Sequence, residues 1–163
     1  MSFSVRVGQR IPPVVLGELV NGEVRRVPLE TLLAGCRSVV FGGPGAFTPI
    51  CSQRHAPEFV AKAAALKKSG IDQIVCIGPN DPWTMAAWGD TLDPTCQLRF
   101  LSDGNLDFAR QSGLIESHPD YFLGDRLKRF VMITQDAVVE HLGIENTILT
   151  LSCSRVDDVF MLA

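Results

Sequence analysis

The order of apolar and polar residues predicts strands that alternate with helices. Residues 37–42 and 73–78 are filled with apolar, β-branched and aromatic side chains, which is typical of buried strands. Residues 58–70 repeat apolar positions at helical spacing and end on a glycine, so we expect an amphipathic helix there. Asp81 followed by Pro82 favours a further helix start, with Asp81 as its N-cap.

Two hairpins are predicted, one near each end of the chain. The Asn-Gly pair between 14–19 and 23–28 is a strong signal for antiparallel strands, and 128–134 with 137–142 form the second hairpin. The other expected elements are a helix over 81–88, a strand over 97–101, a helix over 106–111, a loop over 117–124 and a helix over 156–162. This alternation indicates an α/β sandwich with a mixed sheet, in one domain over 1–163.

Composition narrows the range of partners. The chain has 163 residues, 46% of them hydrophobic, and its 15 basic and 18 acidic residues leave a net charge of -3. Since no block of like charges occurs, nucleic acid and anionic membranes are poor candidates for partners. No apolar run approaches the roughly 20 residues that span a bilayer, and the N-terminus lacks an apolar signal segment. We expect a cytoplasmic protein, with an organellar location after presequence removal left open.

The cysteines do not suggest a disulfide scaffold or a metal centre. There are five, an odd number, widely scattered and without a Cys-x-x-Cys pair. Cys51 and His55 could face the same side of a helix, but zinc usually takes four ligands and no second pair is visible. We therefore expect no metal site.

Cys51 stands out by its position. It follows a turn-forming run of glycine and proline and precedes the predicted helix, with Pro49 suited to the first helical turn. Free backbone N–H groups at a helix start favour the thiolate, which is the reactive form of cysteine. From this context alone, the alternative of a buried structural cysteine stays open.

The residues around Cys51 carry a resemblance. The run PGAFTPICSQRH at 44–55 resembles the signature of the peroxiredoxins, in the subfamily called type II in plants and peroxiredoxin 5 in animals. Further segments follow in the order and at about the spacing of that subfamily: Asn80-Asp81-Pro82-Trp83, Trp88-Gly89 and Arg126-Leu127-Lys128-Arg129-Phe130. The similarity runs from about Val7 to the C-terminus.

The resemblance implies a fold and an activity. The expected fold is thioredoxin-like, a mixed central sheet flanked by helices, with an N-terminal β-hairpin. The expected activity is a thiol-dependent peroxidase that reduces hydrogen peroxide, organic hydroperoxides and peroxynitrite through a sulfenic acid at Cys51, without metal or organic cofactor. A thioredoxin-like or glutaredoxin-like donor would supply the electrons, and the resemblance suggests a non-covalent homodimer packed through loops around the active site.

Three further residues belong to the site by this resemblance. Thr48 offers a hydroxyl that can donate to a peroxide or accept from it, although an ordinary helix N-cap is the alternative. Pro49 shields the thiolate and fixes the turn. Arg129 would share a strand face with Val131 and Ile133, so that its guanidinium could point inward to the sulfur. Because both faces of this strand are apolar, alternation alone does not choose Arg129 over Arg126 and Lys128.

Two residues after Cys51 are expected to shape its helix. His55 lies one turn on, where we favour a packing or hydrogen-bonding role over that of a general base. Pro57 removes a helical hydrogen bond to the Gln53 carbonyl, so we expect a kink or weak first turns.

Two cysteines could resolve the sulfenic acid. Cys153 matches the resolving cysteine of the animal type, and Cys76 matches the second cysteine of the plant type. Cys76 falls in a strand that we expect to be buried, whereas Cys153 precedes the last helix, where exposure is expected. We favour Cys153, with Cys76 and an external thiol as alternatives.

A disulfide reductase and a non-catalytic binding module are the two alternative functions. A disulfide reductase of thioredoxin type would normally show Cys-x-x-Cys in place of Thr48-Pro49-Ile50-Cys51. A redox-sensing or chaperone-like binding module on the same fold is the alternative without catalysis. Ile50 and the Gly42-Gly43 pair depart from the usual pattern of the subfamily, which bears on peroxide preference.

Overall fold

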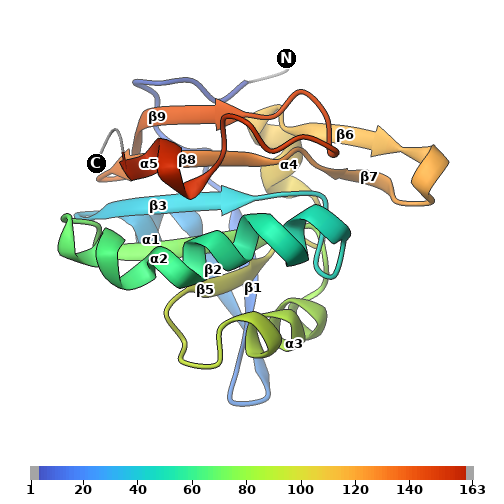
Figure 1. The fold of residues 1–163 in the computed structure, drawn as a ribbon, viewed down its shortest axis with the longest axis horizontal. Coiled ribbons are helices and arrows are strands. Elements are labelled where there is room, and N and C mark those ends of the chain that lie inside the picture. Colours follow the sequence, from blue (N-terminus) through green and yellow to red (C-terminus); the bar gives the residue numbers. More distant parts are fainter. Residues whose placement is uncertain (1–3, 161–163) are drawn as a thin grey trace.

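A seven-stranded mixed sheet forms the centre of the protein, in a computed structural model that describes residues 4–160 (Figure 1). Its order is β2-β1-β5-β4-β3-β8-β9. The three central strands β3, β4 and β5 are parallel, and all other pairings are antiparallel. The strands are β1 (Val15–Val20), β2 (Glu23–Pro28), β3 (Arg37–Gly42), β4 (Gln73–Gly78), β5 (Arg99–Ser102), β8 (Phe130–Gln135) and β9 (Val138–Ile144).

Helices cover both faces of the sheet and enclose two apolar cores. The helices are α1 (Leu29–Leu33), α2 (Ala56–Lys68), α3 (Pro82–Leu92), α4 (Asp107–Ser112) and α5 (Val156–Phe160). Buried side chains of α2, α3 and α5 pack together on one face, and those of α1 and α4 on the other. The central strands are therefore apolar on both faces, as the two runs of apolar residues predicted.

Alternation along β8 decides which residues reach the core under α2. Val131 and Ile133 pack with α2, while Phe130 and Met132 point to the opposite core. Since successive side chains of a strand face opposite ways, Arg129 falls on the α2 face with Val131. The sequence predicted that shared face correctly, although Arg129 lies just before the strand rather than in it.

Several predicted boundaries are corrected. The helix expected over 58–70 begins earlier, because helical conformation already starts at Pro49. The loop expected over 117–124 is wrong at both ends: β6 (Ile115–His118) and β7 (Gly124–Leu127) form a separate hairpin that projects from the sheet (Figure 1). These strands are short and mostly polar, so no apolar alternation marks them. Helix α1 was not predicted, and the last two residues of the helix expected over 156–162 lie outside the described residues.

Within residues 4–160, no helix has both the length and the apolar character needed to cross a membrane.

Candidate active site

The helix that carries Cys51 has unusually wide first turns. Cys51–His55 is a π-helix, in which the Ala56 N–H donates to the Cys51 carbonyl, five residues back. Pro57 has no N–H and cannot donate to the Gln53 carbonyl, which explains the widened turn. The expected irregularity is therefore confirmed, and the Cys51 side chain is buried, with 2% of its surface exposed.

Arg129 provides a buried positive charge beside this sulfur. Its Nη2 donates to Cys51 Sγ at 3.4 Å, and its Nη1 donates to the carbonyls of Ile148 and Thr150 at 2.7 and 3.1 Å. Arg129 is only 1% exposed, and its Nε has no hydrogen-bond partner among the described residues. A guanidinium in this position stabilises negative charge on the sulfur and keeps one donor free.

Glycine is required where the sheet meets the sulfur. A Cβ at Gly43 would lie 2.7 Å from Cys51 Sγ, and a Cβ at Gly42 would collide with the Ile77 carbonyl oxygen. The glycine pair that departs from the subfamily pattern therefore lets the end of β3 lie directly against the Cys51 sulfur.

The loop before the helix is held by residues far away in sequence. The Thr48 hydroxyl donates to the Gly45 carbonyl at 2.7 Å, so its proton is engaged and its lone pairs remain available. Asn80 Oδ1 accepts from the Ala46 N–H at 2.8 Å, and Arg126 Nη1 donates to the Pro44 carbonyl at 3.1 Å. The sequence did not predict that Asn80 and Arg126 hold this loop, although both residues lie in the segments that carry the resemblance.

His55 links the helix to the C-terminal part of the chain. Its Nε2 lies 2.8 Å from the Ser154 carbonyl oxygen, and its ring packs edge-on against Phe41 and Phe59. Burial lowers the pKa of His55 to about 3, so the ring is neutral and Nε2 donates the hydrogen bond. The expected packing and hydrogen-bonding role is confirmed.

The other cysteines differ sharply in environment. Cys76 is 1% exposed, and burial, followed by the neighbouring Cys51, raises the pKa of its thiol well above the ordinary value. Cys153 is exposed and its Sγ donates to the Ile144 carbonyl at 3.1 Å. Both predictions of burial and exposure are confirmed, and Cys36 and Cys96 lie elsewhere without an evident role.

A cavity of about 270 Å³ opens beside Thr48 and Arg129. Apart from the Arg129 head group and the Thr48 hydroxyl, its walls are nearly all apolar. They are formed by Pro44, Thr48, Pro49, Ile50, Tyr121, Leu123, Arg129, Ile148 and Leu149. Such a site suits a small molecule with one polar end and an apolar body.

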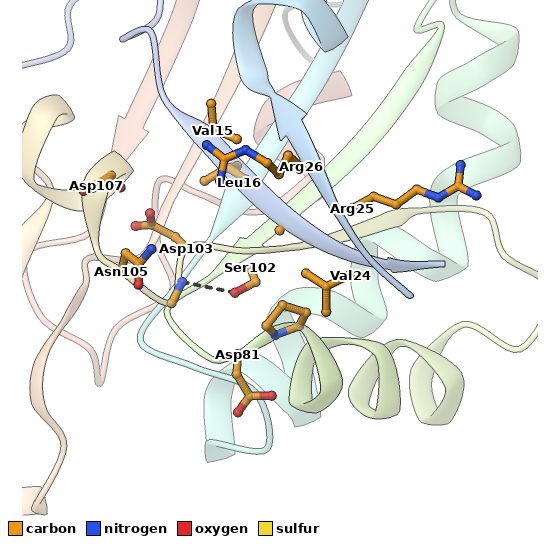
Figure 2. A pocket seen from close by; sticks show the side chains of 13 residues that line it. Val15, Leu16, Val24, Arg25, Arg26, Asp81, Ser102, Asp103, Asn105 and Asp107 are labelled. Carbon is orange, nitrogen blue, oxygen red and sulfur yellow. Dashed lines mark hydrogen bonds between the residues drawn. The ribbon is translucent and has the colours of Figure 1, made fainter. Parts of the chain in front are cut away.

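A second hollow, of about 320 Å³, lies away from the cysteine where the β1–β2 hairpin meets the start of α3 (Figure 2). Burial raises the pKa of Asp103 there to about 6, but its oxygens already accept from the N–H groups of Phe108 and Ala109 at the start of α4. Asp103 thus has a structural role. No three His, Cys, Asp or Glu side chains within residues 4–160 come together in a way that could hold a metal ion.

Comparison with known proteins agrees with this geometry. The sequence model of the Redoxin family matches residues 6–159. The chain is 40% identical over 150 residues to the chloroplastic peroxiredoxin-2E of Arabidopsis thaliana, covering 89% of this chain but 64% of that protein. It is 35% identical to peroxiredoxin-2D of the same plant, covering 82% of this chain and 89% of that protein.

Solved structures show the same fold. Reduced Prx3 from Vibrio vulnificus in complex with hydrogen peroxide matches with a TM-score of 0.91 and 31% identity, covering 96% of this chain and 98% of that one. Peroxiredoxin 5 from Alvinella pompejana matches with a TM-score of 0.79 and 31% identity, covering 88% and 92% of the two chains. The expected thioredoxin-like fold is therefore confirmed, and the chain belongs to the Redoxin family and, within it, to the peroxiredoxins of the type II and peroxiredoxin 5 subfamily, a class of thiol peroxidases.

Proposed function

We propose that this peroxiredoxin reduces hydrogen peroxide, organic hydroperoxides and peroxynitrite through Cys51. The observation that carries the proposal is the 3.4 Å contact between Arg129 Nη2 and Cys51 Sγ, inside a site from which water is largely excluded. A cation in contact with the sulfur favours the nucleophilic thiolate, and burial strengthens the electrostatic interaction.

The first chemical step follows from the groups around the sulfur. The thiolate attacks one peroxide oxygen, an S–O bond forms and the O–O bond breaks. The leaving group departs as water or an alcohol after taking a proton, or as nitrite when the substrate is peroxynitrite, and Cys51 becomes a sulfenic acid. The free Nε of Arg129 can donate to the oxygen that gains charge, and the Thr48 oxygen can accept the peroxide proton because its own proton points to Gly45.

The apolar cavity supports organic hydroperoxides as substrates. Its polar groups, Arg129 and Thr48, could hold the O–O group while Ile50 and Leu149 contact an alkyl body. Hydrogen peroxide needs only the polar end, and the related Prx3 of Vibrio vulnificus was solved with that molecule bound.

Cys153 is the proposed resolving residue. Its thiol is exposed, whereas Cys76 is enclosed in the core and burial strongly disfavours the thiolate that must attack the sulfenic acid. The resulting disulfide would be reduced by a thioredoxin-like or glutaredoxin-like donor. Because Cys51 is buried and Cys153 Sγ is bonded to the Ile144 carbonyl, the disulfide requires a local rearrangement of the reduced protein.

Exposed apolar side chains surround the cavity and support the proposed non-covalent homodimer. Phe47, Tyr121, Phe122 and Leu149 are between 55% and 96% exposed. Apolar residues of this size at a rim are typical of an association surface. Sedimentation velocity on the reduced protein tests the dimer.

The test of the catalytic proposal combines kinetics with peptide mapping. We expect Cys51→Ser to lose turnover with hydrogen peroxide while keeping its fold, and one equivalent of peroxide to give a Cys51–Cys153 disulfide within one chain of the wild type. Cys96→Ser is the matched control, because this exposed cysteine has no proposed role, and its turnover should be unchanged.

The outcomes separate the alternatives. Wild-type Cys51 that is oxidised no faster than a free thiol would leave only a binding module on this fold. A disulfide mapped to Cys51 and Cys76 would assign resolution to the buried cysteine. Full turnover of Cys153→Ser with a thioredoxin donor would show that an external thiol resolves the sulfenic acid.

A further inference from the structure

Two opposite charges hold residues 146–154, the segment that leads to Cys153 and is called the Cys153 segment below. Arg129 and Glu145 are neighbours across the β8–β9 pairing, where the Glu145 N–H donates to the Arg129 carbonyl at 2.9 Å. The Arg129 guanidinium binds two carbonyl oxygens in the first half of the segment, those of Ile148 and Thr150. The Glu145 carboxylate binds hydrogen-bond donors that lie mainly in the second half.

Glu145 is buried, and its carboxylate accepts an unusually large number of hydrogen bonds. It is 2% exposed, and its oxygens accept six hydrogen bonds. Burial raises the pKa of Glu145, but the bonds from Ser152, Ser154 and Cys153 more than offset this and hold the pKa at about 2. The donors are the N–H groups of Ser152, Cys153 and Ser154 and the hydroxyls of Thr150, Ser152 and Ser154.

The same contacts reach the helix of Cys51. Ser154 donates its N–H and hydroxyl to Glu145, while its carbonyl accepts from His55 Nε2 at 2.8 Å. His55 belongs to the π-helix that begins with Cys51. The Cys153 backbone packs directly over β9, since a Cβ at Gly143 would collide with its carbonyl oxygen.

This arrangement opposes the disulfide that closes the proposed cycle. A disulfide needs Cβ atoms within about 4.5 Å of each other. In the reduced protein Cys51 is buried against Arg129, whereas Cys153 is exposed and bonded to the Ile144 carbonyl. Cys153 Sγ must leave the Ile144 carbonyl to reach Cys51, and the hydrogen bonds to Glu145 hold the Cys153 backbone against that movement.

We propose that Glu145 is the positioning residue that sets the rate of disulfide formation, because its carboxylate retains the Cys153 segment and, through Ser154 and His55, the Cys51 helix. This inference rests on the proposed resolving role of Cys153. In the step concerned, the Cys153 thiolate attacks Sγ of the Cys51 sulfenic acid, an S–S bond forms, the S–O bond breaks and the oxygen leaves as water after taking a proton from solvent. If the Cys153 segment is released slowly, a second peroxide molecule has time to oxidise the Cys51 sulfenic acid to sulfinic acid.

The negative charge of Glu145 also opposes disulfide formation by disfavouring the Cys153 thiolate. Although the residue is exposed, partial desolvation of its sulfur and then the Glu145 carboxylate raise the pKa of the Cys153 thiol, and Asp158 of α5 acts in the same direction. The nearby Arg155 guanidinium is engaged with Glu58 at 2.9 Å. Removing the charge of Glu145 should therefore let Cys153 ionise at a lower pH, apart from any loosening of the segment.

The test is Glu145→Gln, with Glu140→Gln as the matched control. Gln keeps one oxygen for the N–H donors but loses the charge, which roughly halves the strength of such bonds. Glu140 lies on β9, the strand that ends just before Glu145, is exposed and forms an ion pair with Arg37. Single-turnover reactions with hydrogen peroxide are quenched and alkylated, and mass spectrometry follows sulfenic acid, sulfinic acid and the Cys51–Cys153 disulfide.

We expect Glu145→Gln to form the disulfide roughly tenfold faster, with the first oxidation changed by less than about threefold. The pH profile of disulfide formation should shift to lower pH, and half-maximal conversion to sulfinic acid should need roughly tenfold more peroxide. Glu140→Gln should match the wild type in all three. A purely structural role of Glu145 would slow both steps and leave the pH profile in place.

The remaining outcomes overturn the inference in distinguishable ways. An equal or slower rate of disulfide formation in Glu145→Gln, with the disulfide present in the wild type, overturns the role of Glu145 alone. Absence of the Cys51–Cys153 disulfide from the wild type overturns the resolving role and this inference with it. If Glu145→Gln does not fold, Ser154→Ala removes one hydroxyl donor and keeps the charge, and a rate no faster than that of the wild type overturns the proposal.

Discussion

Cys51 and Cys153 occupy opposite electrostatic environments. Cys51 is buried and touches the guanidinium of Arg129, whereas Cys153 is exposed and lies beside the carboxylate of Glu145. A cation stabilises a thiolate, and an anion opposes one. The two environments suit a thiol that attacks first and a thiol that stays protonated until the first has been oxidised.

Cys76 shows that burial by itself does not activate a thiol. It lies in the same core as Cys51, but burial raises the pKa of its thiol well above the ordinary value. The difference between the two buried cysteines is the contact with Arg129. The charge that touches the sulfur, rather than its depth, therefore distinguishes the candidate nucleophile.

The two environments have a common origin. Arg129 and Glu145 face each other at the same edge of the β8–β9 pairing and bind the two halves of one segment. That segment also contributes Ile148 and Leu149 to the wall of the apolar cavity beside Arg129. Movement of the segment would thus change the cavity, the arginine and the second thiol together.

Arg129→Met should remove the electrostatic difference between the two thiols, because it deletes the cation and keeps much of the side-chain volume. We expect the rate of Cys51 oxidation by hydrogen peroxide to fall by about 10² to 10³, since loss of one preorganised donor typically has that effect. Stopped-flow measurement of the reduced protein gives the rate.

Lys128→Met is the control, because Lys128 is the neighbouring basic residue and, unlike Arg129, is not buried. It should retain the wild-type rate. A rate for Arg129→Met within about tenfold of the wild type would contradict the role of the guanidinium and direct attention to Arg126, which binds the Pro44 carbonyl.

His55 joins the two environments and gives a prediction of stability against pH. Its pKa is lowered from 6.5 to about 3, so the unfolded chain binds a proton that the folded protein excludes. The folded protein should lose stability as pH falls from about 6.5 towards 3, by up to about 1.4 kcal/mol per pH unit from this group. His55→Gln keeps a donor near the Ser154 carbonyl and cannot titrate, so it should be less sensitive to pH in this window.

Urea unfolding of both proteins at several pH values between 7 and 4 measures the effect. Asp103, whose pKa is raised to about 6, and Glu145, whose pKa is lowered to about 2, also titrate on the acid side, but both are common to the two proteins. The difference between the two curves therefore reports His55. Parallel curves would mean that His55 binds a proton as readily in the folded protein as in the unfolded chain, which would contradict the lowered pKa.

The sequence predicted the parts of this architecture that depend on local patterns. Apolar runs marked β3 and β4, the Asn-Gly pair marked the β1–β2 turn, and Pro57 predicted the irregular turn at Cys51. Each of these rests on a short-range rule: burial on two faces, turn chemistry, or a missing backbone donor.

Parts of the site that depend on distant backbone groups were not predictable. Glu145 was not singled out, because its partners are N–H groups seven to nine residues away, which every sequence provides. The choice of Arg129 over Arg126 and Lys128 needed the resemblance to a known family, since both strand faces are apolar. The short β6–β7 hairpin was missed because its residues show no apolar alternation.

The two cysteines also differ in the polarity of their surroundings: Cys51 lies beside an apolar cavity, whereas polar groups surround Cys153. Ile50 lines that cavity next to Cys51, and Ile50→Ser removes apolar surface that only an alkyl hydroperoxide can contact. We expect the ratio of kcat/KM for tert-butyl hydroperoxide to kcat/KM for hydrogen peroxide to fall by about three- to tenfold, which corresponds to losing roughly one or two buried methylene contacts. Val24→Ser, on the separate hollow of Figure 2, is the matched control and should leave the ratio unchanged. An unchanged ratio in Ile50→Ser would mean that the alkyl group stays outside the cavity. The site at Cys51 would then select only for the peroxide group itself.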